Sequence, residues 1–192
     1  MSTQPKTFIT PEEYLAAERK AETKSEYYDG EVFLMSGASL EHNLIVANII
    51  ASLVQQLRGK GCSTLPNDMR VHIPATGLFT YSDVIVVCGK PQLKEDGHRD
   101  TLLNPTLAVE VLSPSTASYD RGQKFVHYRS LDSFQEYLLV EQHESKLARY
   151  TRQPDDSWVL KDFRGASTRV ELMSVGCVLT LADVYDKVTF PE

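Results

Sequence analysis

Two runs, residues 80–88 and 106–112, most constrain what this chain can fold into. Both are rich in β-branched and other strand-forming residues, and run 80–88 is apolar on both faces when it is read as a strand. A strand with two apolar faces must be covered on both sides, so we expect both runs to lie at the centre of one sheet. Pro105 opens the second run and Pro114 closes it, because proline cannot extend a central strand.

Helical and strand patterns surround these two runs. Thr10 can cap a helix whose first turn holds Pro11 and Glu13, and this capping box predicts a helix over residues 11–22. Residues 41–57 place apolar side chains on more than one face, which predicts a helix buried against a sheet. We expect a third helix at 119–131, a polar loop at 90–104 that is disordered or forms a substrate-contacting flap, and further strands at 31–35, 62–65, 69–73, 136–140, 147–151 and 158–163. The last three have hairpin spacing, which predicts a C-terminal β-meander that extends the sheet.

The composition fits one globular domain spanning residues 1–192, with 42% hydrophobic and 24% charged residues. A net charge of −6 argues against a general nucleic-acid coat protein but allows a nuclease with a local basic rim. Stretch 44–57 is interrupted by polar residues, and residues 1–10 lack the pattern of a secretory signal, so we expect a soluble protein without membrane contact in the cytoplasm. Three cysteines lack any CxxC pair, and we expect all three to be buried thiols: Cys62, Cys88 and Cys177.

Each central run carries one acidic residue against an apolar background. Alternation along the strands places Asp83 on the same face as Ile85, and Glu110 on the same face as Leu112. A buried carboxylate is strongly destabilising unless it is paired, hydrogen-bonded or bound to a cation. Two such acids on neighbouring strands favour a divalent cation, and Mg²⁺ or Mn²⁺ is expected because hard ions take oxygen ligands. The alternative is that either acid pairs with an arginine or accepts hydrogen bonds from a loop.

The helix that follows the second run adds a polar stripe. Asp120, Lys124 and Tyr128 recur every fourth residue, and a short loop at 113–116 would let the stripe face the two carboxylates. The alternative is a solvated helix face with an Asp–Lys pair, which is the commoner outcome for such spacing. Tyr128 could bind a phosphate or position Lys124, although aromatic packing is the more usual role.

These residues together resemble the Uma-type restriction endonuclease family of the PD-(D/E)XK nuclease superfamily. The resemblance is carried by YSDV at 81–84, VEVLSPST at 109–116, and the downstream Asp120, Lys124 and Tyr128. The YYDGE segment at 27–31 and the helix that contains His42 are similar as well, so the resemblance covers about residues 10–150.

The resemblance implies an α/β fold with a restriction-endonuclease-like mixed sheet flanked by helices. It also implies that Asp83 and Glu110 hold the metal. The superfamily's usual lysine would fall at Leu112, which can neither carry charge nor donate a hydrogen bond. Lys124, on the following helix, is its natural substitute, because members of the superfamily can supply the lysine from there. Glu26 resembles an additional N-terminal acid of related nucleases; the alternative is a surface glutamate beside a lysine.

The expected function is that of a magnesium-dependent endonuclease that hydrolyses phosphodiester bonds of DNA as a homodimer. The catalytic residues would be Asp83, Glu110, Lys124 and Glu26. One alternative is a non-catalytic nuclease-fold module for binding or assembly, since a fold does not guarantee a function. RNA or nucleotide phosphodiesters would suit the same site. His42 lies in the first turn of the long helix, where it either approaches the acidic centre or caps the helix, and we favour the cap.

Overall fold

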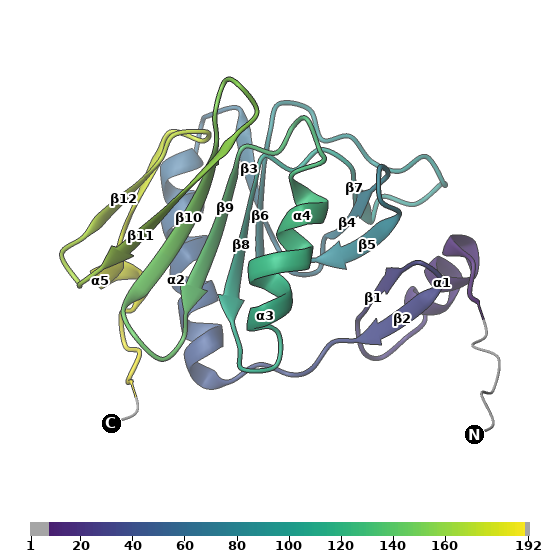
Figure 1. Ribbon diagram of the computed structural model, residues 1–192, viewed down its shortest axis with the longest axis horizontal. Helices are drawn as coiled ribbons and strands as arrows, with labels where there is room; N and C mark the ends of the chain where they lie inside the picture. Colours follow the sequence, from purple (N-terminus) through teal and green to yellow (C-terminus); the bar gives the residue numbers. More distant parts are fainter. Residues whose placement is uncertain (1–7, 191–192) are drawn as a thin grey trace.

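The two apolar runs contribute neighbouring strands to the largest sheet of the molecule (Figure 1). In the computed structural model, which describes residues 8–190, β6 (Val84–Cys88) pairs antiparallel with β8 (Leu107–Leu112). Every residue of β8 is buried, and so is every residue of β6 except Cys88. Their expected place inside a covered sheet is therefore confirmed. Most of segment 1–10, in which we found no secretory signal, lies outside the described residues.

This six-stranded sheet has the order β11-β10-β9-β8-β6-β3 and is mixed, since β8 and β9 run parallel and the other neighbours run antiparallel. Its remaining strands are β3 (Cys62–Pro66), β9 (Glu136–Glu141), β10 (Lys146–Arg152) and β11 (Trp158–Arg164). Strands β9 to β11 form the expected meander. The predicted fold class, a mixed sheet flanked by helices with a C-terminal β-meander, is confirmed.

A second sheet, with the order β2-β1-β5-β4-β7, lies beside the first. Its strands are β1 (Ser25–Tyr28), β2 (Glu31–Leu34), β4 (Arg70–Ile73), β5 (Leu78–Tyr81) and β7 (Thr101–Leu102). Strands β1 and β2 form a hairpin whose turn places Asp29 and Gly30 at φ angles of 47° and 80°, a conformation that glycine and aspartate tolerate. A third sheet consists of β12 (Arg169–Leu172) and β13 (Cys177–Thr180).

Helices cover both faces of the six-stranded sheet (Figure 1). The helical segments are α1 (Pro11–Glu18), α2 (Leu40–Leu57), α3 (Ala117–Tyr119), the π-helical turn η1 (Asp120–Lys124), α4 (Phe125–Tyr128) and α5 (Leu181–Val184). Helix α2 packs on one face, and the continuous segment α3-η1-α4 packs on the other. Within residues 8–190, no helix combines the length and the hydropathy that a membrane span requires.

Alternation along β8 divides the core into two layers. Val109 and its neighbours at every second position pack with α2, whereas Ala108 and Leu112 pack with α4 and Tyr137. Glu110 falls between Ala108 and Leu112 in this alternation, as the sequence predicted, and its side chain faces the α3-η1-α4 layer, where it lies beside Lys124.

One expectation about the acidic strand was wrong. Residues 80–88 do not form a single strand, because the chain leaves the five-stranded sheet after β5 and enters the six-stranded sheet with β6. Ser82 and Asp83 form the junction between the two strands. The β-forming composition is the same on both sides, so sequence pattern did not reveal the break. Its consequence is that Asp83 lies where the two sheets meet.

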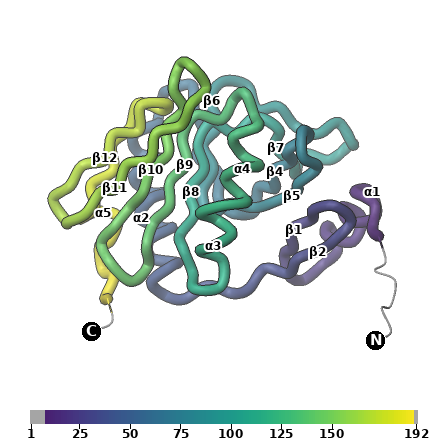
Figure 2. Tube along the Cα trace, in the orientation of Figure 1, coloured from purple at the N-terminus to yellow at the C-terminus, as the bar shows by residue number. Residues whose placement is uncertain are grey.

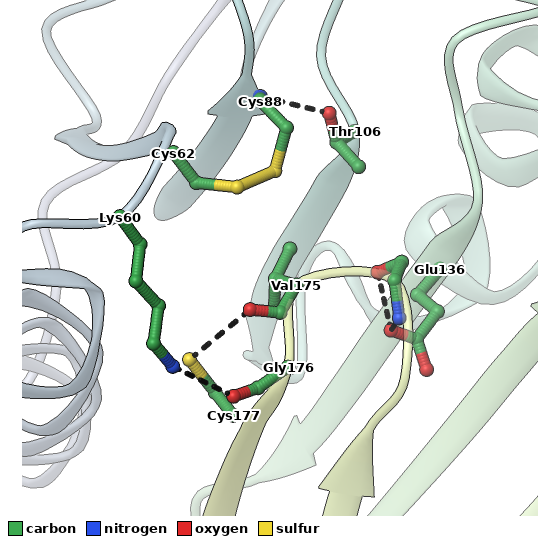
Figure 3. Close-up of a disulfide and its surroundings, with 9 residues drawn as sticks. Lys60, Cys62, Cys88, Thr106, Glu136, Val175, Gly176 and Cys177 are labelled. Carbon is green, nitrogen blue, oxygen red and sulfur yellow. Dashed lines mark hydrogen bonds between the residues drawn. A yellow bond between two sulfur atoms is a disulfide. The ribbon is translucent and has the colours of Figure 1, made fainter.

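The cysteine prediction was also wrong for two of the three residues. Cys62 and Cys88 lie opposite each other in the β3–β6 register, with their Cα atoms 4.0 Å apart, and form a disulfide (Figure 3). Cys177 is a free buried thiol, as expected. The pairing depends on a register between strands that are separated in sequence by 26 residues, which composition and spacing alone do not specify.

Three smaller differences concern element ends. Helix α1 stops at Glu18 instead of position 22, because the Glu18 carboxylate accepts hydrogen bonds from the backbone nitrogen and hydroxyl of Ser25 as the chain turns back. The helix expected at 119–131 begins at Ala117, ends at Tyr128 and contains a π turn. The loop at 90–104 is ordered, since it carries β7 and its Asp100 is paired with Arg19, and it does not line the cleft described below.

Candidate active site

A cleft of about 850 Å³ opens where the two sheets meet. One wall comes from β1, β2 and the linker 35–39 that leads into α2. The opposite wall comes from the end of β8, the loop 113–116 and the segment α3-η1. In Figure 2 the linker crosses the molecule close to the turn that precedes α3. Four acidic residues reach into this cleft together with one lysine: Glu26, Asp83, Glu110, Asp120 and Lys124.

Lys124 stands at the centre of the acidic residues. Its Nζ lies 3.1 Å from Oε1 of Glu110, 3.2 Å from Oε1 of Glu26 and 3.6 Å from Oδ1 of Asp120. It also donates a hydrogen bond of 2.8 Å to the backbone oxygen of Tyr81. Burial by itself lowers the pKa of this ammonium, but the surrounding carboxylates, above all Glu110, raise it well above its usual value. Lys124 is therefore a buried cation paired with carboxylates, and the alternative of a solvated helix face is wrong.

Glu110 and Asp120 are the most deeply buried of these four acids. Burial raises the pKa of the Glu110 carboxyl well above the usual range; Lys124 opposes this rise, and the nearby charges of Asp120 and Asp83 add to it. Oε1 of Glu110 is buried, and among the described residues it has no hydrogen-bonding partner, so its ion pair with Lys124 is made without hydrogen-bond geometry. An oxygen in this condition is incompletely satisfied and can accept a further ligand.

Asp83 is held at the junction between β5 and β6 by two groups. Its Oδ2 accepts a hydrogen bond of 2.7 Å from the backbone nitrogen of Val111, on β8. The same oxygen lies 3.2 Å from Nε2 of His42, at the start of α2. The cap of α2 is Ser39, whose hydroxyl accepts from the backbone nitrogen of His42 at 3.1 Å. Our preference for His42 as a cap was therefore wrong, and its imidazole approaches the acidic centre.

Glu26 belongs to the centre and is not a surface glutamate. The β1–β2 hairpin brings it in, where the Thr80 hydroxyl donates to its Oε1 at 2.6 Å and the Tyr119 hydroxyl donates to its Oε2 at 2.9 Å. Lys24, which sequence proximity offered as its partner, pairs instead with Asp68. Glu26, one of the acidic partners of Lys124, thus comes from the five-stranded sheet, whereas Glu110 comes from the six-stranded sheet.

The π-helical turn η1 carries Asp120 and Lys124, the first two residues of the polar stripe, and Tyr128 follows in α4. Asp120 and Lys124 are buried and line the cleft, whereas Tyr128 is buried without lining it, and burial raises the pKa of Asp120. The Tyr137 hydroxyl donates to the backbone oxygen of Asp120 at 3.1 Å, which fixes the first residue of the turn. π turns are rare and are frequent at functional sites. Tyr128 is a packing residue whose hydroxyl shares a hydrogen bond of 2.6 Å with Ser82, beside Asp83.

Leu112, where the resemblance implied a lysine, lies in the hydrophobic layer with Phe125 and Tyr128. No charge could be accommodated there without disrupting this packing. Lys124, two residues beyond Gly122 on η1, brings an ammonium to Glu110 from the helix. The structure thus places a lysine beside the second acid even though the strand does not supply it.

The residues present fit a hard divalent cation. Carboxylates outnumber cationic side chains in the cleft, and the buried Oε1 of Glu110 lacks a hydrogen-bonding partner among the described residues. Within residues 8–190, no three histidine, cysteine, aspartate or glutamate side chains are already gathered as a metal-binding cluster. Mg²⁺ needs no such cluster, because it is usually bound through one or two carboxylates, several waters and the phosphates of a substrate. Asp83 and Glu110, which line the same cleft, are the candidate ligands.

Sequence reasoning selected Asp83, Glu110, Lys124 and Glu26, and the fold brings all four to one cleft. It weighed the approach of His42 to the acidic centre but preferred the cap, and it did not name Asp83 as the partner. It missed Thr80 and Tyr119, whose hydroxyls donate to Glu26. Thr80 could have been noticed from its place in a strand predicted to be buried. Tyr119 gave no signal, because a tyrosine near the start of a helix is ordinarily a packing residue.

Comparison with known proteins gives a consistent result. Residues 11–182 match the model of the Uma2 family, which is described as "Putative restriction endonuclease". Uncharacterized protein slr1290 of Synechocystis sp. is 34% identical over 182 residues, which are 95% of this chain and 94% of that protein. Uncharacterized protein sll1609 of the same organism is 34% identical over 163 residues, covering 85% of this chain and 92% of that protein.

The fold is also found in a solved structure. The crystal structure of a "putative nuclease belonging to DUF820" from Anabaena variabilis ATCC 29413 matches with a TM-score of 0.76, covering 94% of this chain and 99% of that chain. The sequence identity is 18%, so this likeness concerns the fold alone.

Proposed function

Because this chain belongs to the Uma2 family, we propose that it is a divalent-metal-dependent endonuclease that hydrolyses phosphodiester bonds of DNA. The observation that carries the proposal is a cleft in which the buried ammonium of Lys124 pairs with Glu26, Glu110 and Asp120, and whose lining also contains Asp83. Such an arrangement combines oxygen ligands for a cation with a fixed positive charge, which are the two requirements for attack on an anionic phosphate.

Asp83 and Glu110 are the residues that would hold Mg²⁺ or Mn²⁺. When bound, the ion would supply Lewis-acid stabilisation of the phosphate and a lower pKa for an attacking water. Asp83 is prepared for this role by the Val111 nitrogen and His42, which fix its orientation. Second groups that orient a ligand in this way are a regular feature of metal sites.

Lys124 would act on the reacting phosphate itself. In hydrolysis the water oxygen forms a bond to phosphorus, the bond from phosphorus to the leaving oxygen breaks, and negative charge accumulates on the phosphate oxygens. The Lys124 ammonium is held by Glu26, Glu110 and the backbone oxygen of Tyr81, so its position is fixed before substrate arrives. A preorganised charge of this kind stabilises the transition state without first reorganising solvent. Glu26 is accordingly a positioning residue in our proposal.

Nicking of supercoiled plasmid tests the proposal. We expect relaxed plasmid with Mg²⁺ or Mn²⁺, none with EDTA, and none with Glu110→Gln in either metal. Cleavage that is independent of metal, or that persists in Glu110→Gln, would contradict it. Incubation with single-stranded RNA in the same buffers decides whether DNA is the preferred substrate.

One observation favours a second candidate, a non-catalytic binding or assembly module. The ion pairs of Lys124 already compensate Glu26 and Glu110 without a metal, as a purely structural network would. For this candidate, calorimetric titration would find no Mg²⁺ binding, and plasmid would stay intact with every metal. For the nuclease, Mg²⁺ would bind and its binding would be lost in Glu110→Gln.

We further propose that the protein acts as a homodimer in the cytoplasm, since cutting two strands is commonly handled by twofold symmetry. Light scattering coupled to size exclusion tests the dimer. The Cys62–Cys88 disulfide weighs against a reducing compartment. Thiol titration of freshly extracted protein tests the location: free Cys62 and Cys88 thiols would support the cytoplasm, and an intact disulfide would contradict it.

A further inference from the structure

The mouth of the cleft carries an apolar lip, which we define as Phe33 and Leu34 at the end of β2. Their exposed fractions are 49% and 79%, which is high for large apolar side chains. Both residues line the same cleft as Glu110 and Lys124, so the lip and the acidic centre share one continuous surface. Exposed apolar side chains at the rim of a site usually mark a surface that binds something.

The cleft offers little to neutralise a phosphate backbone. Among the described residues that line it, Lys124 is the one lysine or arginine, and its charge is already surrounded by carboxylates. Two cations close in sequence to cleft residues are also engaged, since Lys24 pairs with Asp68 and Arg121 pairs with Glu141. Tracking a DNA duplex depends on neutralising several phosphates with lysine and arginine. This cleft is therefore poorly suited to hold a duplex by its backbone.

We propose that the apolar lip receives an unpaired nucleobase, so that the cleft selects DNA with a single-stranded segment over fully paired DNA; this inference rests on the proposed nuclease function. An aromatic ring such as that of Phe33 stacks on any base and needs no charge to do so. Across the cleft, the exposed Ser115 and Thr116 carry hydroxyls that share hydrogen bonds of 3.0 Å with the Ser113 hydroxyl. A hydroxyl that accepts in such a bond can donate its own proton to a phosphate oxygen without bringing a counter-charge. A base on the lip would place its neighbouring phosphodiester in the cleft that holds Glu110.

Fluorescence anisotropy tests the proposal for the lip. The probes are a short labelled DNA single strand and its blunt duplex, and the buffer contains Ca²⁺ in place of Mg²⁺. We expect the single strand to bind more tightly and with a shallow salt dependence. Phe33→Ser should weaken single-strand binding roughly tenfold or more, as the loss of one stacking platform does, and Phe33→Trp should preserve it. The matched control is Leu160→Ser, because Leu160 on β11 is 53% exposed and does not line the cleft. Thermal melting of each variant verifies folding.

Two results would overturn the lip. One is duplex binding as tight as single-strand binding. The other is single-strand affinity that Phe33→Ser leaves unchanged, and a shift from dimer to monomer in that variant would then make the lip a self-association surface. Failure of the lip proposal and failure of the nuclease proposal give different results. Metal-dependent nicking without an effect of Phe33→Ser on binding contradicts only the lip, whereas single-strand binding that depends on Phe33 without any hydrolysis contradicts only the catalytic proposal.

Discussion

The Nζ of Lys124, on a π-helical turn, lies 3.1 Å from Oε1 of Glu110, on the central strand β8. This pair joins the helical layer to the sheet inside the cleft. It also means that the carboxylate and the cation are mutually dependent, since each is buried and each has its charge compensated by the other. Substitutions at the two positions should consequently differ in how much they destabilise the metal-free protein. Loss of Lys124 leaves several buried carboxylates unpaired, whereas loss of the Glu110 charge leaves Lys124 with two acidic partners.

Replacing Lys124 with methionine should remove a fixed charge from the proposed transition state and lower kcat by about 10²–10³-fold. It should also reduce the free energy of unfolding by about 3–5 kcal/mol in EDTA, because Glu26 and Glu110 lose their buried partner. Mg²⁺ should restore part of this stability by supplying another cation. Lys90→Met, at an exposed position, is the matched control. An unfolding free energy equal to that of wild type would show that the ion pairs contribute nothing.

Replacing Glu110 with glutamine should abolish metal-dependent cleavage while changing the unfolding free energy in EDTA by less than about 1 kcal/mol. The reason is that Lys124 keeps Glu26 and Asp120, and repulsion between Glu110 and its acidic neighbours disappears. Thermal melting with and without Mg²⁺ checks this. The metal-induced rise in melting temperature should be present in wild type and absent from the variant, and a rise retained in the variant would remove Glu110 from the ligand set.

Replacing His42 with alanine should release Asp83 from one of its two orienting contacts. We expect about 10–100-fold weaker metal affinity or activity, which is the usual effect of removing a group that orients a ligand. Calorimetric titration with Mn²⁺ measures the affinity directly. His143→Ala, at an exposed position, serves as the control. Unchanged affinity together with unchanged kcat would assign His42 to packing alone.

The Cys62–Cys88 disulfide should stabilise the fold by about 3 kcal/mol, because it restricts the unfolded chain across a separation of 26 residues. Replacing both cysteines with serine should lower the melting temperature accordingly, and a reducing agent should then have no further effect. Cys177→Ser, which removes the buried free thiol, should leave the response of the wild-type disulfide to reducing agent intact. Identical melting curves for oxidised and reduced wild type would contradict the prediction.

Stability should fall as the pH drops from about 6.5 to 4, and His72 should contribute to this fall. Burial, with a smaller effect of the Lys94 charge, lowers the pKa of His72 to about 4. In that window the unfolded chain binds a proton that folded His72 does not, so unfolding becomes easier in acid. The contribution is about 1–3 kcal/mol, because the ring is only partly buried.

His72→Phe should flatten this part of the pH profile and keep the stacking on Phe79, where the ring centroids are 4.0 Å apart. The exposed His98 provides the comparison, since His98→Phe should leave the slope unchanged. Urea unfolding at several pH values supplies the measurement. Equal slopes for wild type and His72→Phe would show that His72 protonates alike in the folded and unfolded states.

Local pattern by itself predicted the presence of the main helices, the strand β8 and the acidic residues that the strands bury. The Thr10 cap and the alternation along β8 depend on residues close together in the chain, where geometry follows directly from the periodicity of helix and strand. For the same reason Glu110 could be assigned to its face of the sheet. Lys124 was singled out through the family resemblance, which implies a lysine at the position of Leu112 and a substitute on the following helix.

Tertiary structure decided everything that depends on elements meeting from distant parts of the chain. The break at Ser82 and Asp83, the Cys62–Cys88 register and the approach of His42 to Asp83 have no local signal, because each depends on which sheet a strand joins or where a helix begins relative to it. Tertiary packing also decided whether the polar stripe is buried or solvated. The spacing of Asp120, Lys124 and Tyr128 is compatible with a solvated face, and only the packing of η1 against β8 and the β1–β2 hairpin turns that stripe into an enclosed ionic centre.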